Sequence, residues 1–147
     1  MDNKEFRKIV RLYFENDGFI YKNKCFYKFN NDLIIVVDLQ KSNYQNSFYI
    51  NYAFFVKALY DRIEYPRANM GDIRGRFVYK NRGVVLDYFS LDSISQAELG
   101  NSLEDNINTL LKPVIEDGLN KYFEMFPKAI FTATKKLQQY LVFHHKF

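Results

Sequence analysis

The sequence contains few of the residues that catalytic sites and disulfide-stabilised folds depend on. Its 147 residues include one cysteine, Cys25, and two histidines, and tryptophan is absent. A single cysteine excludes an intrachain disulfide and a metal site built from several cysteines. His144 and His145 are adjacent near the end of the chain, and neighbouring side chains on a helix point about 100° apart. They form a poor ligand or catalytic pair, so the sequence predicts neither a metal site nor a cofactor.

Long hydrophobic runs are also missing. The longest strictly apolar stretch is Leu33–Val37, whereas a membrane-spanning helix needs about 20 such residues. The first eight residues are charged and polar, which is not the pattern of a secretory signal peptide. We therefore expect a cytoplasmic protein that does not enter a membrane.

The overall composition of the chain is typical of one folded domain. Hydrophobic residues make up 48% and charged residues 26%, with 15 phenylalanines and 12 tyrosines. A domain of this length buries roughly 70% of the surface that its unfolded chain exposes. The sequence therefore predicts a single domain over residues 1–147 that folds without a disulfide or a metal.

Apolar residues at helical spacing occur at both ends of the chain. Asp2 is a helix-capping residue, and the stripe that follows it should end at Gly18. Ser95 and Glu98 form a second capping box before another apolar stripe. Pro113 should bend or divide that helix, because it lacks the backbone N–H that the preceding turn needs. We expect one N-terminal helix and two or three C-terminal helices.

Between these helices the apolar residues alternate, which predicts β-strands. The expected strands cover residues 19–29, 33–39, 47–57, 73–80 and 84–89. The stretch 33–39 is apolar at odd and even positions alike, so it should be a central strand covered on both faces. No helical pattern separates the strands, so they should form an antiparallel meander of about five strands. The predicted fold class is α+β.

Charge is unevenly distributed along the chain. Residues 1–83 hold 15 basic and 9 acidic side chains, whereas residues 84–127 hold 2 basic and 8 acidic ones. The net charge of the whole chain is only +4. Such a dipolar surface can steer the approach of a charged partner.

The segment Arg62–Arg82 is the most basic part of the chain, with six basic and two acidic residues. Arg74, Arg76 and Lys80 share one strand parity, which predicts a row of cations, and tyrosines lie in and near the segment. Basic rows with exposed aromatic rings suit single-stranded nucleic acid. They suit an acidic protein partner equally well, and a solvated outer sheet face explains them without any function. These three interpretations remain open from the sequence.

The short segment 38–41 has residue types in common with the metal sites of nucleases. Asp38, Gln40 and Lys41 are residue types that such sites combine, but Lys41 falls on the opposite strand face from the other two. The alternative interpretation is a strand end whose polar residues emerge into solvent. Phosphate-binding glycine loops, dinucleotide fingerprints and His-Glu zinc motifs are all absent from the sequence.

The order of short motifs resembles a known family. The motifs are Asp17-Gly18-Phe19, Cys25-Phe26-Tyr27, Leu39-Gln40-Lys41-Ser42, Phe48-Tyr49-Ile50-Asn51, an arginine–glycine segment over residues 67–76 and a C-terminal helix from Leu110 to Leu119. This set resembles the uncharacterised bacterial domain-of-unknown-function family 4304, over roughly residues 5–127. Members of that family often carry tryptophan near the arginine segment, and this chain has none. The resemblance supports the α+β fold and implies no activity.

These observations favour a non-enzymatic module that binds a macromolecule, most of all a protein. A small α+β domain of this kind is also similar in character to the immunity proteins that cover toxins. The predicted binding residues are Gln40, Lys41, Arg67, Arg74 and Arg76. The alternative is a nucleic-acid-binding domain that uses Arg62–Arg82, and the third hypothesis is a metal-dependent hydrolase or nuclease.

Overall fold

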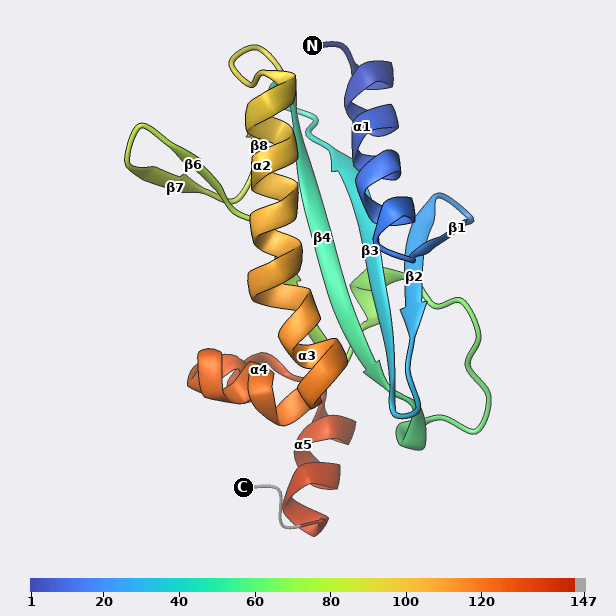
Figure 1. Ribbon diagram of the computed structural model, residues 1–147. Helices are drawn as coiled ribbons and strands as arrows, with labels where there is room; N and C mark the ends of the chain where they lie inside the picture. Colours follow the sequence, from blue (N-terminus) through green and yellow to red (C-terminus); the bar gives the residue numbers. More distant parts are fainter. Residues whose placement is uncertain (145–147) are drawn as a thin grey trace.

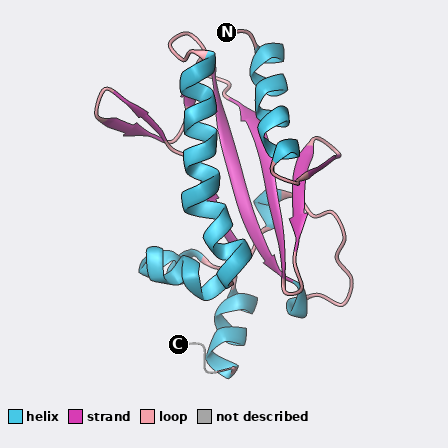
Figure 2. Cartoon of the chain, in the orientation of Figure 1, coloured by secondary structure: helices cyan, strands magenta, loops and turns pink. Residues whose placement is uncertain are grey.

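A computed structural model describes residues 1–144 and shows helices packed on one face of an antiparallel sheet (Figures 1 and 2). The strands are β1 (Ile20–Lys22), β2 (Cys25–Phe29), β3 (Leu33–Lys41), β4 (Ser47–Val56), β5 (Ile73–Arg76), β6 (Tyr79–Asn81), β7 (Val84–Leu86) and β8 (Phe89–Ser90). The α-helices are α1 (Asn3–Asn16), α2 (Gln96–Asn106), α3 (Lys112–Asp117), α4 (Leu119–Met125) and α5 (Lys135–Phe143). Short 3-10 segments are η1 (Lys57–Leu59), η2 (Ala68–Met70) and η4 (Pro127–Thr132), and η3 (Ile107–Leu111) is a π-helical turn. The predicted α+β domain is confirmed.

The main sheet is an antiparallel meander. Within residues 1–144 its strand order is β1-β2-β3-β4-β5, and β8 also pairs with β4. The longest pairing joins β3 and β4, from Leu33 opposite Val56 to Lys41 opposite Phe48. β6 and β7 form a separate ribbon that projects from the body of the molecule (Figure 1). The predicted antiparallel meander is confirmed.

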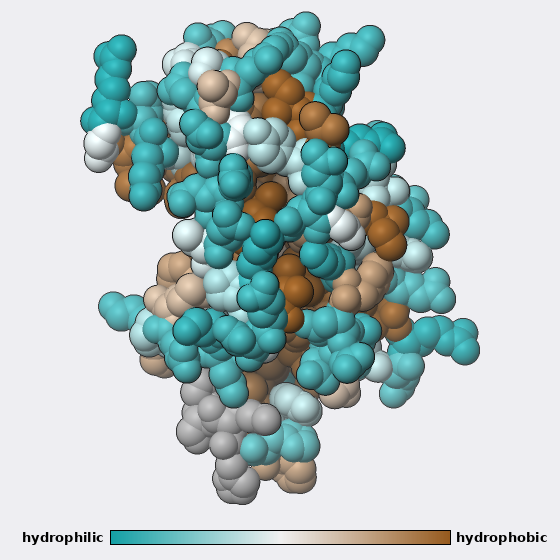
Figure 3. Space-filling model, viewed as in Figure 1, coloured by the Kyte–Doolittle hydropathy of each residue, from teal (hydrophilic) through white to brown (hydrophobic). Residues whose placement is uncertain are grey.

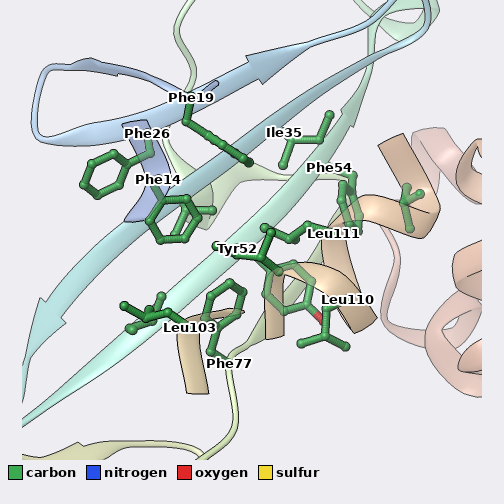
Figure 4. Close-up of a cluster of buried hydrophobic side chains, with 14 of the residues drawn as sticks. Phe14, Phe19, Phe26, Ile35, Tyr52, Phe54, Phe77, Leu103, Leu110 and Leu111 are labelled. Carbon is green, nitrogen blue, oxygen red and sulfur yellow. The ribbon is translucent and has the colours of Figure 1, made fainter. Parts of the chain in front are cut away.

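The main core lies between the sheet and the helices. Phe6, Val10 and Phe14 form the fully buried stripe of α1. On β4 every second residue from Phe48 to Val56 belongs to this core, as the alternation expected of a strand requires. Figure 4 shows aromatic rings from α1, β2 and β4 meeting leucines from the C-terminal helices. The core is built mainly from phenylalanine and leucine.

The other face of the sheet is covered over only part of its area. A second buried cluster consists of Cys25, Tyr27, Ile34, Val36, Ala53, Phe55 and Ala68. The segment between β4 and β5, residues 57–72, lies over this cluster with Tyr60, Ile63 and Tyr65 packed against it. This cover explains why Leu33–Val37 is buried at every position, as the sequence predicted. The remainder of this face, toward the C-terminal end of β3, stays open.

The expectation of one strand over residues 19–29 is wrong. The stretch is a hairpin in which β1 pairs with β2. Asn23 and Lys24 at its turn have φ values of 52° and 64°, the left-handed conformation that reverses a tight hairpin. Phe26 therefore packs in the main core while Cys25 belongs to the opposite face. The Lys28 ammonium donates a hydrogen bond to the carbonyl of Asp17 at 2.8 Å.

The single strand expected over residues 73–80 is also wrong. It divides into β5 and β6, because the Asn106 side chain takes the place of a neighbouring strand at Val78. The Asn106 amide accepts from the Val78 N–H at 2.9 Å and donates to its carbonyl at 2.8 Å. Lys80 consequently lies on the ribbon, in a different sheet from Arg74 and Arg76. The predicted three-residue cationic row does not form.

The C-terminal helices follow the predicted signals closely. Ser95 and Glu98 form the expected capping box at the start of α2. Pro113 lies in the first turn of α3, where its missing N–H is not needed, and the π-helical turn η3 separates α3 from α2. Gly118, with φ of 90°, ends α3. Among the described helices, none has the length and apolar composition that crossing a bilayer requires.

Candidate functional site

The open part of the sheet face carries a floor of polar side chains from three adjacent strands. Asp38 and Gln40 come from β3, Asn51 from β4, and Arg74 and Arg76 from β5. Asp38 lies opposite Asn51, and Asn51 in turn lies opposite Arg76. Because strand side chains alternate between faces, this register brings these groups to the same side of the sheet. The side opposite the helices is therefore polar where the covering segment ends.

The segment between β4 and β5 forms a wall beside this floor. It contributes Arg67 and Asn69, and floor and wall together enclose an open cavity of about 890 Å³. The wall is anchored next to these residues. The Tyr27 hydroxyl donates to the carbonyl of Pro66 at 2.9 Å, and Ala68 is buried in the second cluster. We call this cavity the arginine pocket, defined by Arg67, Arg74 and Arg76.

Asn51 organises the floor of the arginine pocket. Its Nδ2 donates to Asp38 Oδ1 at 3.0 Å and to Gln40 Oε1 at 3.1 Å. Its Oδ1 accepts from Arg76 Nε at 3.1 Å. Arg76 is also paired with Asp87, at 3.0 Å between Nη1 and Oδ2. Arg76 is thus held in place by a neutral amide and a carboxylate.

The other two arginines are paired with no carboxylate in the part of the chain that the structure describes. Arg74 Nη1 donates to the backbone carbonyl of Asn69 at 3.1 Å. Across residues 1–144, neither Arg67 nor Arg74 takes part in an ion pair. Both are exposed at the cavity. The arginine pocket therefore offers two unneutralised guanidinium groups to an anionic ligand.

Cys25 also lines the arginine pocket, directly across the strand pair from Asp38. Burial raises the pKa of its thiol, and the Asp38 carboxylate raises it further, while Tyr27 and Arg67 act in the opposite direction. A thiol with a raised pKa stays protonated at neutral pH, and the thiolate is the nucleophilic form. Cys25 therefore acts as a small packing residue in the second buried cluster.

Four of the five residues predicted to bind, namely Gln40, Arg67, Arg74 and Arg76, meet in this one cavity. Lys41 lies apart from them. Its side chain packs near the ring of Phe48, and its ammonium donates to the Gln45 carbonyl at 3.3 Å and to Asn46 Oδ1 at 3.2 Å.

Sequence reasoning missed Asn51 and Asn69. Asn51 had a detectable signal, because it is the one amide in the otherwise apolar and aromatic stretch Phe48–Val56. Asn69 had none, because its place at the cavity depends on how the irregular segment folds over the sheet.

The nuclease-like arrangement is not assembled around Asp38. Asp38 is bound by Asn51, and Lys41 lies on the opposite strand face. Over residues 1–144, no three histidine, cysteine, aspartate or glutamate side chains group closely enough to hold a metal ion. His144 is exposed after α5, with its ring 4.3 Å from that of Tyr140, and His145 lies outside the described residues.

Treatment with EDTA or with a reducing agent is expected to leave the melting temperature unchanged. The buried aromatic core and the free thiol of Cys25 account for folding without a cross-link. Differential scanning calorimetry with and without each reagent measures this directly. A fall of several degrees with EDTA would mean that a metal site contributes to the fold.

Comparison with known proteins gave one match. A family model described as "Domain of unknown function (DUF4304)" matches residues 10–117. The matched range includes β3, β4 and β5 and the segment that carries Arg67, so it contains the elements that form the floor and wall of the arginine pocket. No curated protein and no solved structure matches the chain.

Proposed function

The chain belongs to the family described as domain of unknown function DUF4304, and we propose that its arginine pocket binds an acidic segment of a partner protein without catalysing a reaction. The observation that carries this proposal is the pair Arg67 and Arg74, which face an open cavity with no carboxylate partner among the described residues. Arginine binds carboxylates through a rigid fork of N–H donors and is enriched at the centres of protein interfaces.

The polar groups around the two arginines suit a peptide ligand. Gln40 on the floor and Asn69 on the wall supply amide groups, which can pair with backbone N–H and carbonyl groups of a bound chain. Asp38 is already bound by Asn51, so its carboxylate is partly satisfied within the protein. An acidic segment bound in this cavity would contact both cations and neutral hydrogen-bonding groups.

The aromatic side chains near the arginine pocket favour a protein over a nucleic acid. Single-stranded nucleic acids bind on exposed aromatic rings that stack with the bases. The Tyr49 ring is covered by the Arg76 guanidinium, at 4.0 Å from its centroid, and Tyr52 is only 3% exposed. The tyrosines that suggested base stacking, Tyr60, Tyr65 and Tyr79, do not line this cavity: Tyr60 and Tyr65 pack against the second cluster, and Tyr79 is buried in the main core.

The cytoplasm is the compartment that fits this proposal, because Cys25 is a free thiol and cytoplasmic proteins keep their cysteines reduced. A binding domain of this size that covers an acidic surface also fits the behaviour of an immunity protein.

The double variant Arg67→Ala with Arg74→Ala is expected to weaken capture of the partner by at least about tenfold while the protein stays folded. The test is affinity capture from a nuclease-treated extract of the source organism, quantified by mass spectrometry. The matched control is Arg62→Ala with Lys80→Ala, which removes two charges from the same basic segment at exposed positions outside the arginine pocket.

The proposal requires a protein that is enriched on the wild type and the control but lost on the Arg67/Arg74 variant. Equal retention by all three baits would place the binding surface elsewhere. Equal loss on both double variants would show that only the net charge matters. Proteins captured from an untreated extract and all lost from the nuclease-treated one would mean that the partner is a nucleic acid.

A further inference from the structure

A second cationic cleft lies on the helix side of the sheet, between α1 and the β1–β2 hairpin. Lys4, Arg7, Lys8 and Arg11 are spaced three and four residues apart, so they share one flank of α1. Lys24, at the hairpin turn, faces them from the other side of the cleft. The cleft has a volume of about 320 Å³. We call it the α1 cleft, defined by these five cations.

The floor of the α1 cleft is apolar and the arginines are held by aromatic rings. Phe26 and Leu39 line the floor. The Arg7 guanidinium lies 4.8 Å from the centroid of the Phe48 ring, and the Arg11 guanidinium lies 4.2 Å from that of Tyr21. A cation stacked on a ring keeps its N–H groups free at the ring edge. The stacking itself therefore positions both arginines without using the donors that bind an anion.

Among the described residues, carboxylates do not balance this charge. Arg11 pairs with Glu15 at 2.6 Å, but Lys4, Arg7, Lys8 and Lys24 form no ion pair within residues 1–144. Like charges three and four residues apart destabilise a helix. Four unneutralised cations around a concave surface, in an arrangement unfavourable to the helix itself, indicate that a polyanion supplies the missing negative charge.

The burial of the apolar face of α1 argues against a lipid surface as the polyanion. A helix that binds a lipid surface inserts its apolar face into the membrane. The apolar residues of α1, Phe6, Val10 and Phe14, are completely buried in the protein core. Figure 3 shows mainly hydrophilic residues over the α1 region, broken by scattered hydrophobic ones. The arrangement does not suit a membrane surface.

We propose that the α1 cleft binds the phosphate backbone of a single-stranded nucleic acid. The row from Lys4 to Arg11 runs along about two turns of helix, which suits a linear series of phosphates better than one isolated anion. Tyr21, 38% exposed at the edge of the cleft, carries the Arg11 guanidinium on its ring, so it holds a cation in place and the contacts to the ligand come from the cations. Cationic grooves that follow the backbone bind single strands with little sequence preference.

This site is separate from the arginine pocket. Phe26 in its floor belongs to the main core on the helix side, whereas Cys25 in the arginine pocket belongs to the cluster on the opposite face. It also lies outside the Arg62–Arg82 segment that the sequence suggested for nucleic-acid binding. The inference does not rest on the proposed protein partner.

The test is fluorescence anisotropy with a labelled oligothymidine of about 15 nucleotides, between about 50 and 200 mM salt. The variant Lys4→Ala with Lys8→Ala is expected to bind about tenfold more weakly at low salt. The slope of log affinity against log salt should become shallower by about 1.4, because each lost phosphate contact removes about 0.7. Circular dichroism should show an unchanged or slightly higher melting temperature, because two repulsive neighbours are removed.

The matched control is Lys128→Ala with Lys135→Ala, which removes the same charge from exposed positions near the C-terminus. It should change the affinity less than about twofold, and so should the Arg67→Ala/Arg74→Ala variant. The inference is overturned if the wild type does not bind oligothymidine at about 50 mM salt. Equal weakening by both lysine pairs, or tighter binding to duplex DNA or to vesicles of anionic phospholipid, would also overturn it.

Discussion

Replacing Phe54 by alanine is expected to lower the free energy of unfolding by about 3–5 kcal/mol, the usual range for truncating a buried phenylalanine. Phe54 is fully buried in the middle of β4. Its ring centroid lies 5.3 Å from that of Tyr122 in α4 and 5.7 Å from that of Tyr52 on the same strand. The truncation would leave a cavity between the sheet and the C-terminal helices.

Urea denaturation measures this loss, and Phe131→Ala is the matched control. Phe131 is 79% exposed, so the same chemical change should alter stability by no more than about 0.5 kcal/mol. A loss below about 1 kcal/mol at Phe54 would mean that the parity of β4 is reversed. The tyrosine pair Tyr52–Tyr122, whose hydroxyls are 2.7 Å apart, joins the same two elements and should be weakened by the cavity.

Replacing Asp72 by alanine is expected to lower the free energy of unfolding by at least about 3 kcal/mol, because each buried donor left without an acceptor costs about 1–3 kcal/mol. Asp72 is 1% exposed, just before β5. Its Oδ2 accepts from the Val56 N–H at 2.9 Å. Its Oδ1 accepts from the hydroxyls of Tyr60 and Thr134, both at 2.8 Å. Three separate parts of the chain depend on this one carboxylate.

The affected parts are the end of β4, the segment over the second sheet face and the N-cap of α5. Burial, together with the bond to Asp72, raises the pKa of the Tyr60 hydroxyl, so Tyr60 remains a donor at neutral pH. Thermal and urea unfolding measure the effect, with the exposed Asp61→Ala as the control. A loss at Asp72 no larger than that at Asp61 would show that the three donors find other acceptors.

Loss of the Asp72 hydrogen bonds is also expected to affect the arginine pocket. The segment between β4 and β5 carries Arg67, and it is fixed at one end by Asp72 through Tyr60 and in the middle by the bond from Tyr27 to Pro66. The arginine pocket therefore depends on contacts that are far from it in the sequence. The geometry that positions Arg67 is supplied by the second buried cluster.

The sequence by itself determined the features that depend on local pattern. Alternation identified β4 and the face it buries, and apolar residues at both parities identified β3 as covered on two sides. The Ser95–Glu98 capping box and Pro113 marked the start and the interruption of the C-terminal helices. These signals are readable because helix caps, prolines and strand periodicity act within a few residues of where they occur.

The tertiary structure decided the features that depend on distant partners. Alternation predicted one strand where Asn106, from a helix about thirty residues later, binds Val78 and divides it into β5 and β6. Shared parity grouped Lys80 with Arg76, but strand pairing placed Lys80 in the separate ribbon. Arg67 joined Arg74 only because an irregular segment folds over the second face of the sheet. Such contacts are set by packing between residues far apart in the chain, and local periodicity carries no information about them.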